Sequence, residues 1–92
     1  MDLAGARRIR LVCRPKEGVE PLGDDEVREK ITRFDEGLGD AGSALGDSSV
    51  IAAHVDVNAD DRDAARDDAL VVAERALDAS GLAEHFRVEE AG

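Results

Sequence analysis

Three short segments of the chain alternate apolar and polar residues with a period of two, the pattern of a half-buried β-strand. They cover residues 8–13, 50–57 and 85–88. Pro15 ends the first strand, because proline donates no hydrogen bond to a sheet. Each segment has one apolar face, and the side chains predicted to point inward are Ile9, Leu11, Cys13, Ile51, Ala53, Val55, Val57, Phe86 and Val88.

Two further segments repeat their apolar residues at the three- and four-residue spacing of an amphipathic helix. The first begins near Asp24, where acidic residues suit the positive end of the helix dipole, and it is stopped by Gly37 and Gly39. The second runs from about Asp61 to Ser80, before Gly81. The inward positions are Val27, Ile31, Phe34 and Leu38 in the first helix and Ala65, Ala69, Leu70, Val72, Ala73, Ala76 and Leu77 in the second.

Residues 37–49 are rich in glycine and carry few side chains that could pack. We expect either a Gly-rich loop or a weak edge strand near Ala44 and Leu45. If the segment is a loop, the strand at 50–57 lies at the edge of the sheet, where unpaired backbone groups invite pairing with another chain.

The order is therefore strand, helix, loop or weak strand, strand, helix, strand, in a single domain of 92 residues. Because each strand has one apolar face, helices should cover only one side of the sheet. The predicted fold class is α+β, a two-layer α/β sandwich of ferredoxin-like (split βαβ) type with one open sheet face. The alternative is a three-stranded parallel βαβαβ unit.

The charge balance narrows the classes of partner. The formal net charge is −10, so a nucleic-acid partner is not expected, and neither is an anionic membrane surface. The single cysteine, Cys13, cannot form an intramolecular disulfide, and no apolar signal segment precedes the first strand. We expect a cytoplasmic protein, and the excess of Arg over Lys together with abundant Ala, Gly and Asp is typical of a GC-rich bacterial or archaeal genome.

The predicted topology gathers the outward side chains of three neighbouring strands, because the first strand lies between the third and the last. These side chains are Arg8, Arg10, His54, Asp56, His85, Arg87 and Glu89. They form either a site for an anionic ligand, a subunit contact built on Arg–carboxylate pairs, or the plain solvated face of a one-sided sheet. The candidate ligand- or partner-binding residues are Arg8, Arg10, His54, Asp56 and Arg87.

Residues 56–60 begin like a calcium-binding loop, with acidic or amide side chains at alternate positions. The resemblance fails at Asp61, where the loop needs glycine, and at Asp67, where it needs glutamate. These acids suit the N-terminus of the second helix instead. Two histidines and one cysteine do not make a zinc site, so we predict no metal and no other cofactor.

Catalytic candidates are few. Cys13 shares a face with Ile9 and Leu11, which favours a buried core thiol over a nucleophile. His54 lies two residues before Asp56 on the same strand face, where the carboxylate could orient it as a general base. No Ser or Cys spacing completes a triad, so we lean against an enzyme.

The sequence thus favours a small acidic interaction or accessory domain, which contacts a protein partner or a second copy of itself through the open sheet face or an edge. The alternative is a protein that binds a small anionic ligand, or a small dimeric enzyme. In either form of the alternative, Arg10, His54 and Arg87 would line the site.

Overall fold

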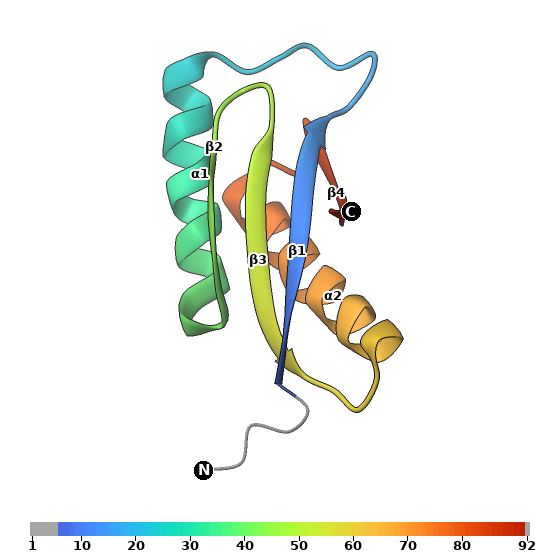
Figure 1. The fold of residues 1–92 in the computed structure, drawn as a ribbon. Helices are drawn as coiled ribbons and strands as arrows, with labels where there is room; N and C mark the ends of the chain where they lie inside the picture. The colour runs from blue at the N-terminus through green and yellow to red at the C-terminus, as the bar shows by residue number, and fades with distance from the viewer. Residues whose placement is uncertain (1–5, 92) are drawn as a thin grey trace.

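The computed structural model describes residues 6–91, in which two helices pack against a four-stranded sheet. Figure 1 shows the sheet in front, with α2 passing behind β3 and β1 and α1 lying alongside β2. The elements in chain order are β1 (Ala6–Pro15), α1 (Asp24–Leu38), a 3-10 turn (Gly39–Ala41), β2 (Gly42–Gly46), β3 (Ile51–Asn58), α2 (Arg62–Ser80) and β4 (Phe86–Glu90).

The strands lie in the order β2-β3-β1-β4, and every neighbouring pair is antiparallel. The predicted α+β sandwich with one open face is therefore confirmed, with β1 between β3 and β4 as expected. The parallel βαβαβ alternative is wrong. Its strands would need apolar residues on both faces, whereas these strands have them on one.

The core lies between the helices and the inward side chains of the sheet. All four predicted inward residues of α1 are buried, and Phe34 is completely enclosed. In α2 the buried face is mostly alanine, which lets the two helices approach closely: a Cβ on Gly37 of α1 would lie 3.2 Å from the Cβ of Ala76. Leu11 and Ile51 complete this core from the sheet.

The glycine-rich segment supplies β2, so the edge-strand alternative describes residues 42–46 and β3 is an interior strand. Its glycines are required by close approach to β3. A Cβ on Gly42 would overlap the carbonyl of His54, and one on Gly46 would overlap the carbonyl of Val50. A strand with glycine at both ends carries almost no side-chain pattern, which explains why the sequence left two interpretations open.

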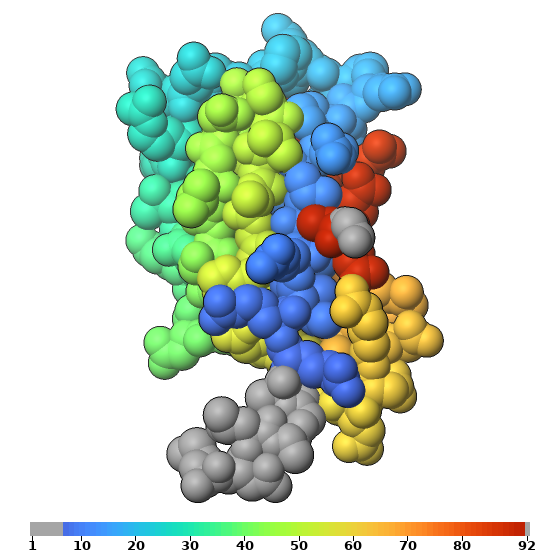
Figure 2. All heavy atoms as spheres, in the orientation of Figure 1, coloured from blue at the N-terminus to red at the C-terminus, as the bar shows by residue number. Residues whose placement is uncertain are grey.

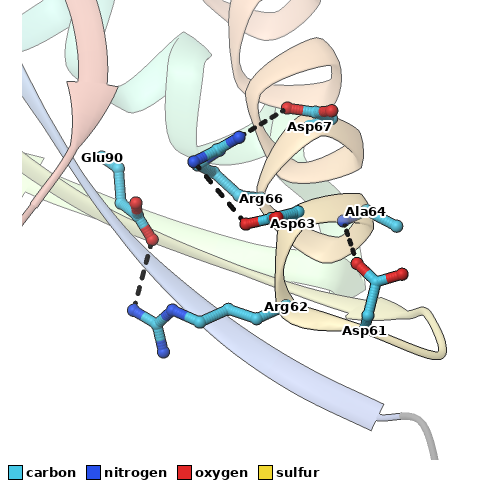
Figure 3. A network of polar contacts seen from close by, with 7 residues as sticks. All are labelled: Asp61, Arg62, Asp63, Ala64, Arg66, Asp67 and Glu90. Atoms are coloured by element: carbon cyan, nitrogen blue, oxygen red, sulfur yellow. Dashed lines mark hydrogen bonds and ion pairs between the residues drawn. The ribbon is translucent and has the colours of Figure 1, made fainter.

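A group of polar contacts holds the start of α2 (Figure 3). Asp61 caps the helix, because its Oδ1 accepts a hydrogen bond from the Ala64 N–H at 2.8 Å. Arg62 Nη2 lies 3.3 Å from Glu90 Oε2, which links the helix to the end of β4. The acids after β3 therefore include a helix cap, as their pattern suggested.

Candidate functional site: the open face of the sheet

The open face consists of the outward side chains of the four strands, and neither helix of residues 6–91 covers it (Figures 1 and 2). β1 crosses its middle, between β3 on one side and β4 on the other. Strand alternation and register assign to this face Arg8, Arg10, Val12, Arg14, Ser43, Leu45, Ala52, His54, Asp56, Arg87 and Glu89.

The register places Arg8 opposite Asp56 and Arg10 opposite His54. Hydrogen bonds alternate along an antiparallel pair, and the Arg10 C=O accepts from the Ala91 N–H, on the β4 side of β1. The pairs Arg8–Asp56 and Arg10–His54 therefore occupy non-hydrogen-bonded positions between β1 and β3, where facing side chains come closest. This register brings four of the five candidate residues together.

Arg8 and Asp56 form a two-point ion pair. The Nε of Arg8 lies 2.9 Å from Oδ1 of Asp56, and its Nη2 lies 3.3 Å from Oδ2. This hydrogen bonding, helped by the positive charges of Arg8 and His54, holds the pKa of the Asp56 carboxyl below its ordinary value. The same hydrogen bonding, together with the negative charge of Asp56, raises the pKa of Arg8. Both carboxylate oxygens of Asp56 accept hydrogen bonds from Arg8. The described contacts include no His54–Asp56 hydrogen bond that would orient a general base.

The far end of the face carries the second ion pair. Arg14 Nε lies 3.1 Å from Oε1 of Glu89, and Arg87 stands opposite Arg14 in the register. Like charges in facing positions repel. Within residues 6–91, neither Arg87 nor Arg10 takes part in an ion pair.

An apolar row separates the two charged ends. Val12, Ala52 and Leu45 face one another across β1, β3 and β2, and Leu45 is 70% exposed. Together with Arg10 and His54 this row lines a shallow depression of about 430 Å³. An apolar centre with a charged rim is the usual composition of a protein-binding patch.

The charge of the open face is opposite to that of the chain. Its named residues include four arginines and two carboxylates, on a chain whose net charge is −10. The excess of acid therefore lies in the rest of the protein. Both helices contribute to it, since each contains more Asp and Glu than Lys and Arg.

Two sequence expectations fare differently here. His85 is not an outward residue of β4, because the strand begins at Phe86 and His85 lies in the preceding turn, with its Nδ1 3.2 Å from the Glu20 carbonyl oxygen. Arg87 is on the open face, but at the opposite end from Arg8. Sequence reasoning missed Arg14, Ser43 and Leu45. Extending the alternation of the first strand by one step would have found Arg14.

Cys13 lies near the C-terminal end of β1, on the core-facing side of the strand, and is completely buried. Burial raises the pKa of its thiol from 9.0 to about 11, because a thiolate would be poorly solvated there. Cys13 is therefore a protonated core residue at neutral pH, which gives it the environment of an inert structural cysteine.

The acidic residues around 56–61 make separate contacts and do not converge on one point. Asp56 bonds to Arg8 and Asp61 caps α2, while the backbone carbonyl of Asp60 accepts from Arg7 Nη2 at 3.3 Å. In the described part of the chain, no three His, Cys, Asp or Glu side chains lie together in a way that could hold a metal ion.

Comparison with models of known protein families, with curated proteins and with solved structures gives no match. Neither helix of residues 6–91 has the length and apolar character needed to cross a membrane.

Proposed function

We propose that this chain is an interaction domain whose open sheet face docks the acidic surface of a partner protein. The observation that carries the proposal is the charge contrast: a face with an excess of arginine on a chain of net charge −10. Complementary charge guides association and selects partners. A partner with carboxylates around a small apolar centre would match both the rim and the middle of this face.

Arg10 and Arg87 are the arginines best placed to meet such carboxylates, because Arg8 and Arg14 already have partners within the chain. An arginine guanidinium binds a carboxylate through two parallel hydrogen bonds, which gives geometric specificity as well as energy. Arg10 also borders the apolar row at Val12, so polar and apolar contacts would form together.

The size of the face indicates a modest interface. Four strands about 4.8 Å apart, of which the two interior ones have ten and eight residues and the two edge ones five each, offer at most roughly 500 Å² of flat area. A standard interface buries about 800 Å² per partner, so docking on this face alone would be weak or transient.

A face-to-face contact between two copies fits less well than an acidic partner. Two identical faces would each bring an excess of arginine, and like charges in opposition suppress association. A partner with a carboxylate-rich surface removes this repulsion and supplies ligands for Arg10 and Arg87.

The test is calorimetric titration of the protein with a synthetic peptide rich in Glu and Leu, beside a peptide in which Lys replaces Glu. We expect the acidic peptide to bind and the basic one to bind more weakly, in spite of the net charge of −10. Arg10→Glu should weaken binding by more than about tenfold, while Arg75→Glu, an equal charge change on the exposed side of α2, should not. Equal effects of the two variants would overturn the proposal.

One observation favours a second candidate, the binding of a small anion. Arg10, His54 and Ser43 form one row across β1, β3 and β2, and all three line the depression of about 430 Å³. Guanidinium, imidazole and hydroxyl groups suit a carboxylate or phosphate. Titration with inorganic phosphate and with succinate separates the candidates, because a small-anion site should bind one of them without needing Leu45, whereas peptide docking should weaken in Leu45→Ser.

A further inference from the structure

The two edges of the sheet differ in whether another strand can pair with them. At the β2 edge, Asp35 of α1 blocks the approach, because its Oδ1 accepts a hydrogen bond from the Ala44 N–H at 2.8 Å. This carboxylate occupies the donor that an incoming strand would need, a common protection of edge strands. β4 forms the opposite edge.

The backbone groups that β4 turns away from β1 follow from the register. The Lys16 N–H donates to the His85 C=O, and the Ala91 N–H donates to the Arg10 C=O. Because hydrogen bonds alternate along an antiparallel pair, Phe86, Val88 and Glu90 direct their N–H and C=O groups outward. The Phe86 N–H donates to the Leu82 C=O, and no described contact engages the N–H or C=O of Val88.

We propose that a second copy of this chain pairs antiparallel with the β4 edge, about a two-fold axis that passes between the two Val88 residues. Each Val88 then donates to and accepts from the partner's Val88. Each Glu90 N–H donates to the C=O of the partner's Phe86. Together, the two four-stranded sheets become one continuous sheet.

The charges on the open face select this occupant and this register. With Val88 on the axis, Arg87 faces the partner's Glu89 and Glu89 faces the partner's Arg87, at positions where facing side chains approach closely. In the single chain, Arg87 has only like-charged Arg14 opposite it. The second copy brings the carboxylate of its Glu89, which would then lie between its own Arg14 and Arg87 of the first chain, so the strand is complementary to itself.

The core-facing side of the edge also suits a second copy. A groove of about 300 Å³ runs beside β4, lined by Leu77, Ala83, Phe86 and Val88 together with Lys16 and Glu74. The partner's Val88 would lie on this side of the sheet and cover apolar atoms of the groove. Both the backbone groups and the side chains on the two faces of β4 are thus engaged.

The dimer does not depend on the proposed docking function. It would engage Arg87 and leave Arg10 as the arginine that meets the docked protein, and it would enlarge the surface for docking. A two-fold axis perpendicular to the sheet places both open faces on the same side. The combined face would offer roughly 1,000 Å², twice the estimate for one chain. The two proposals fail separately, since the dimer is tested by mass and peptide docking by titration.

The test is the native mass, measured by sedimentation across a range of protein concentrations, for the wild type and two charge reversals. The wild type should form dimers. Arg87→Glu sets a carboxylate against the partner's Glu89, and Glu89→Arg sets a guanidinium against the partner's Arg87, so each variant should weaken dimerisation by more than about tenfold. A mixture of the two variants is a further sample.

 In this mixture, one chain carries carboxylates at positions 87 and 89 and the other carries guanidiniums at both. Both cross-strand pairs are then complementary, and mixing should restore a heterodimer that is visible by native mass spectrometry.

The matched controls are Arg75→Glu and Glu36→Arg, equal charge changes on the exposed sides of the two helices, which should leave dimerisation unchanged. A wild type that stays monomeric at millimolar concentration would overturn the proposal. Failure of the mixed variants to associate while the wild type dimerises would also overturn it, because the dimer would then use another surface.

A backbone test is independent of charge. Val88→Pro removes an N–H that β1 does not use, and proline is tolerated at a sheet edge, so the monomer should keep its fold by circular dichroism while the dimer is lost. In the wild type, the Val88 amide should exchange its hydrogen more slowly as protein concentration rises. Exchange at Val88 that does not change with concentration in a dimeric sample would refute pairing at this edge.

Discussion

The two faces of the sheet are built from alternate residues of the same strands, yet they differ in burial and in charge. Along β1, Leu11 and Cys13 are buried beneath the helices, while Arg10 and Val12, which alternate with them, point to the open side. Burial of the inner set drives folding. Because the outer set contributes little burial, its excess of arginine is not a requirement of the fold, and the open face is free to serve recognition.

Shortening neighbouring side chains on opposite faces of the sheet should have very different effects on stability. Leu11→Ala should cost about 2–5 kcal/mol of unfolding free energy, because it leaves a cavity in a closed core. Val12→Ala should cost less than about 1 kcal/mol, since its side chain is only partly covered. Chemical denaturation of both variants measures the difference, and equal losses would show that the faces are not distinct.

The buried thiol gives the inner face a signature in alkali. The pKa of Cys13 is about 11 in the folded chain and 9.0 when exposed, so unfolding releases a proton between these values. Stability should therefore be unaffected by Cys13 below pH 9 and fall by about 2–3 kcal/mol as pH rises to 11 and above.

Denaturation of wild type and Cys13→Ala across this pH range isolates the effect of the thiol. The variant loses some stability at every pH because the core is less full, but the part of the alkaline decline due to Cys13 should disappear. Parallel curves for the two proteins would mean that the thiol is not protected by burial.

The two edges of the sheet can be made alike by removing Asp35. Asp35→Ala breaks the bond to the Ala44 N–H and should cost about 1–2 kcal/mol, because a hydrogen bond from a partly buried backbone group to a carboxylate is lost. It should also increase self-association, since the β2 edge becomes open to pairing. Glu36→Ala, on the exposed side of the same helix, is the control for the lost charge. Unchanged association in Asp35→Ala would show that this carboxylate does not protect the edge.

The smallest effect is expected on the open face itself. Asp56→Asn removes the ion pair with Arg8, but both side chains are exposed and the melting temperature should hardly change at neutral pH. The pKa of Asp56 is lowered in the folded chain, so its slight stabilisation is present above the ordinary carboxyl pKa and disappears as pH falls through the lowered value. Thermal melts from neutral to strongly acidic pH check this, and a large loss at neutral pH would mean that the open face supports the fold.

The fold was predictable where one-sided burial leaves a local pattern. The alternation around Leu11 and the spacing of Val27, Ile31 and Phe34 each reflect a face packed against the core. β2 was left undecided because its glycines are required by the approach of β3 and its edge is completed by Asp35 of α1. Those contacts are tertiary and leave no periodic signal.

The candidate site was predictable to the same extent. Alternation placed Arg10 and His54 outward, and the topology made them neighbours. The sequence could not show that Asp56 bonds to Arg8 and not to His54, because this depends on the register between strands that are distant in the chain. His85 was misplaced because β4 starts one residue later than its alternation suggests, with the preceding turn bonded to Leu82.

Mapping amide chemical shifts during titration with the Glu- and Leu-rich peptide tests the central claim most directly. If the open face is the docking surface, the shift changes should concentrate on Arg10, Val12, Ala52 and His54 and saturate together. The amide signals of α1 and α2 should not shift. Shifts concentrated on the helices, or no saturable shifts on the sheet, would contradict the assignment of recognition to the open face.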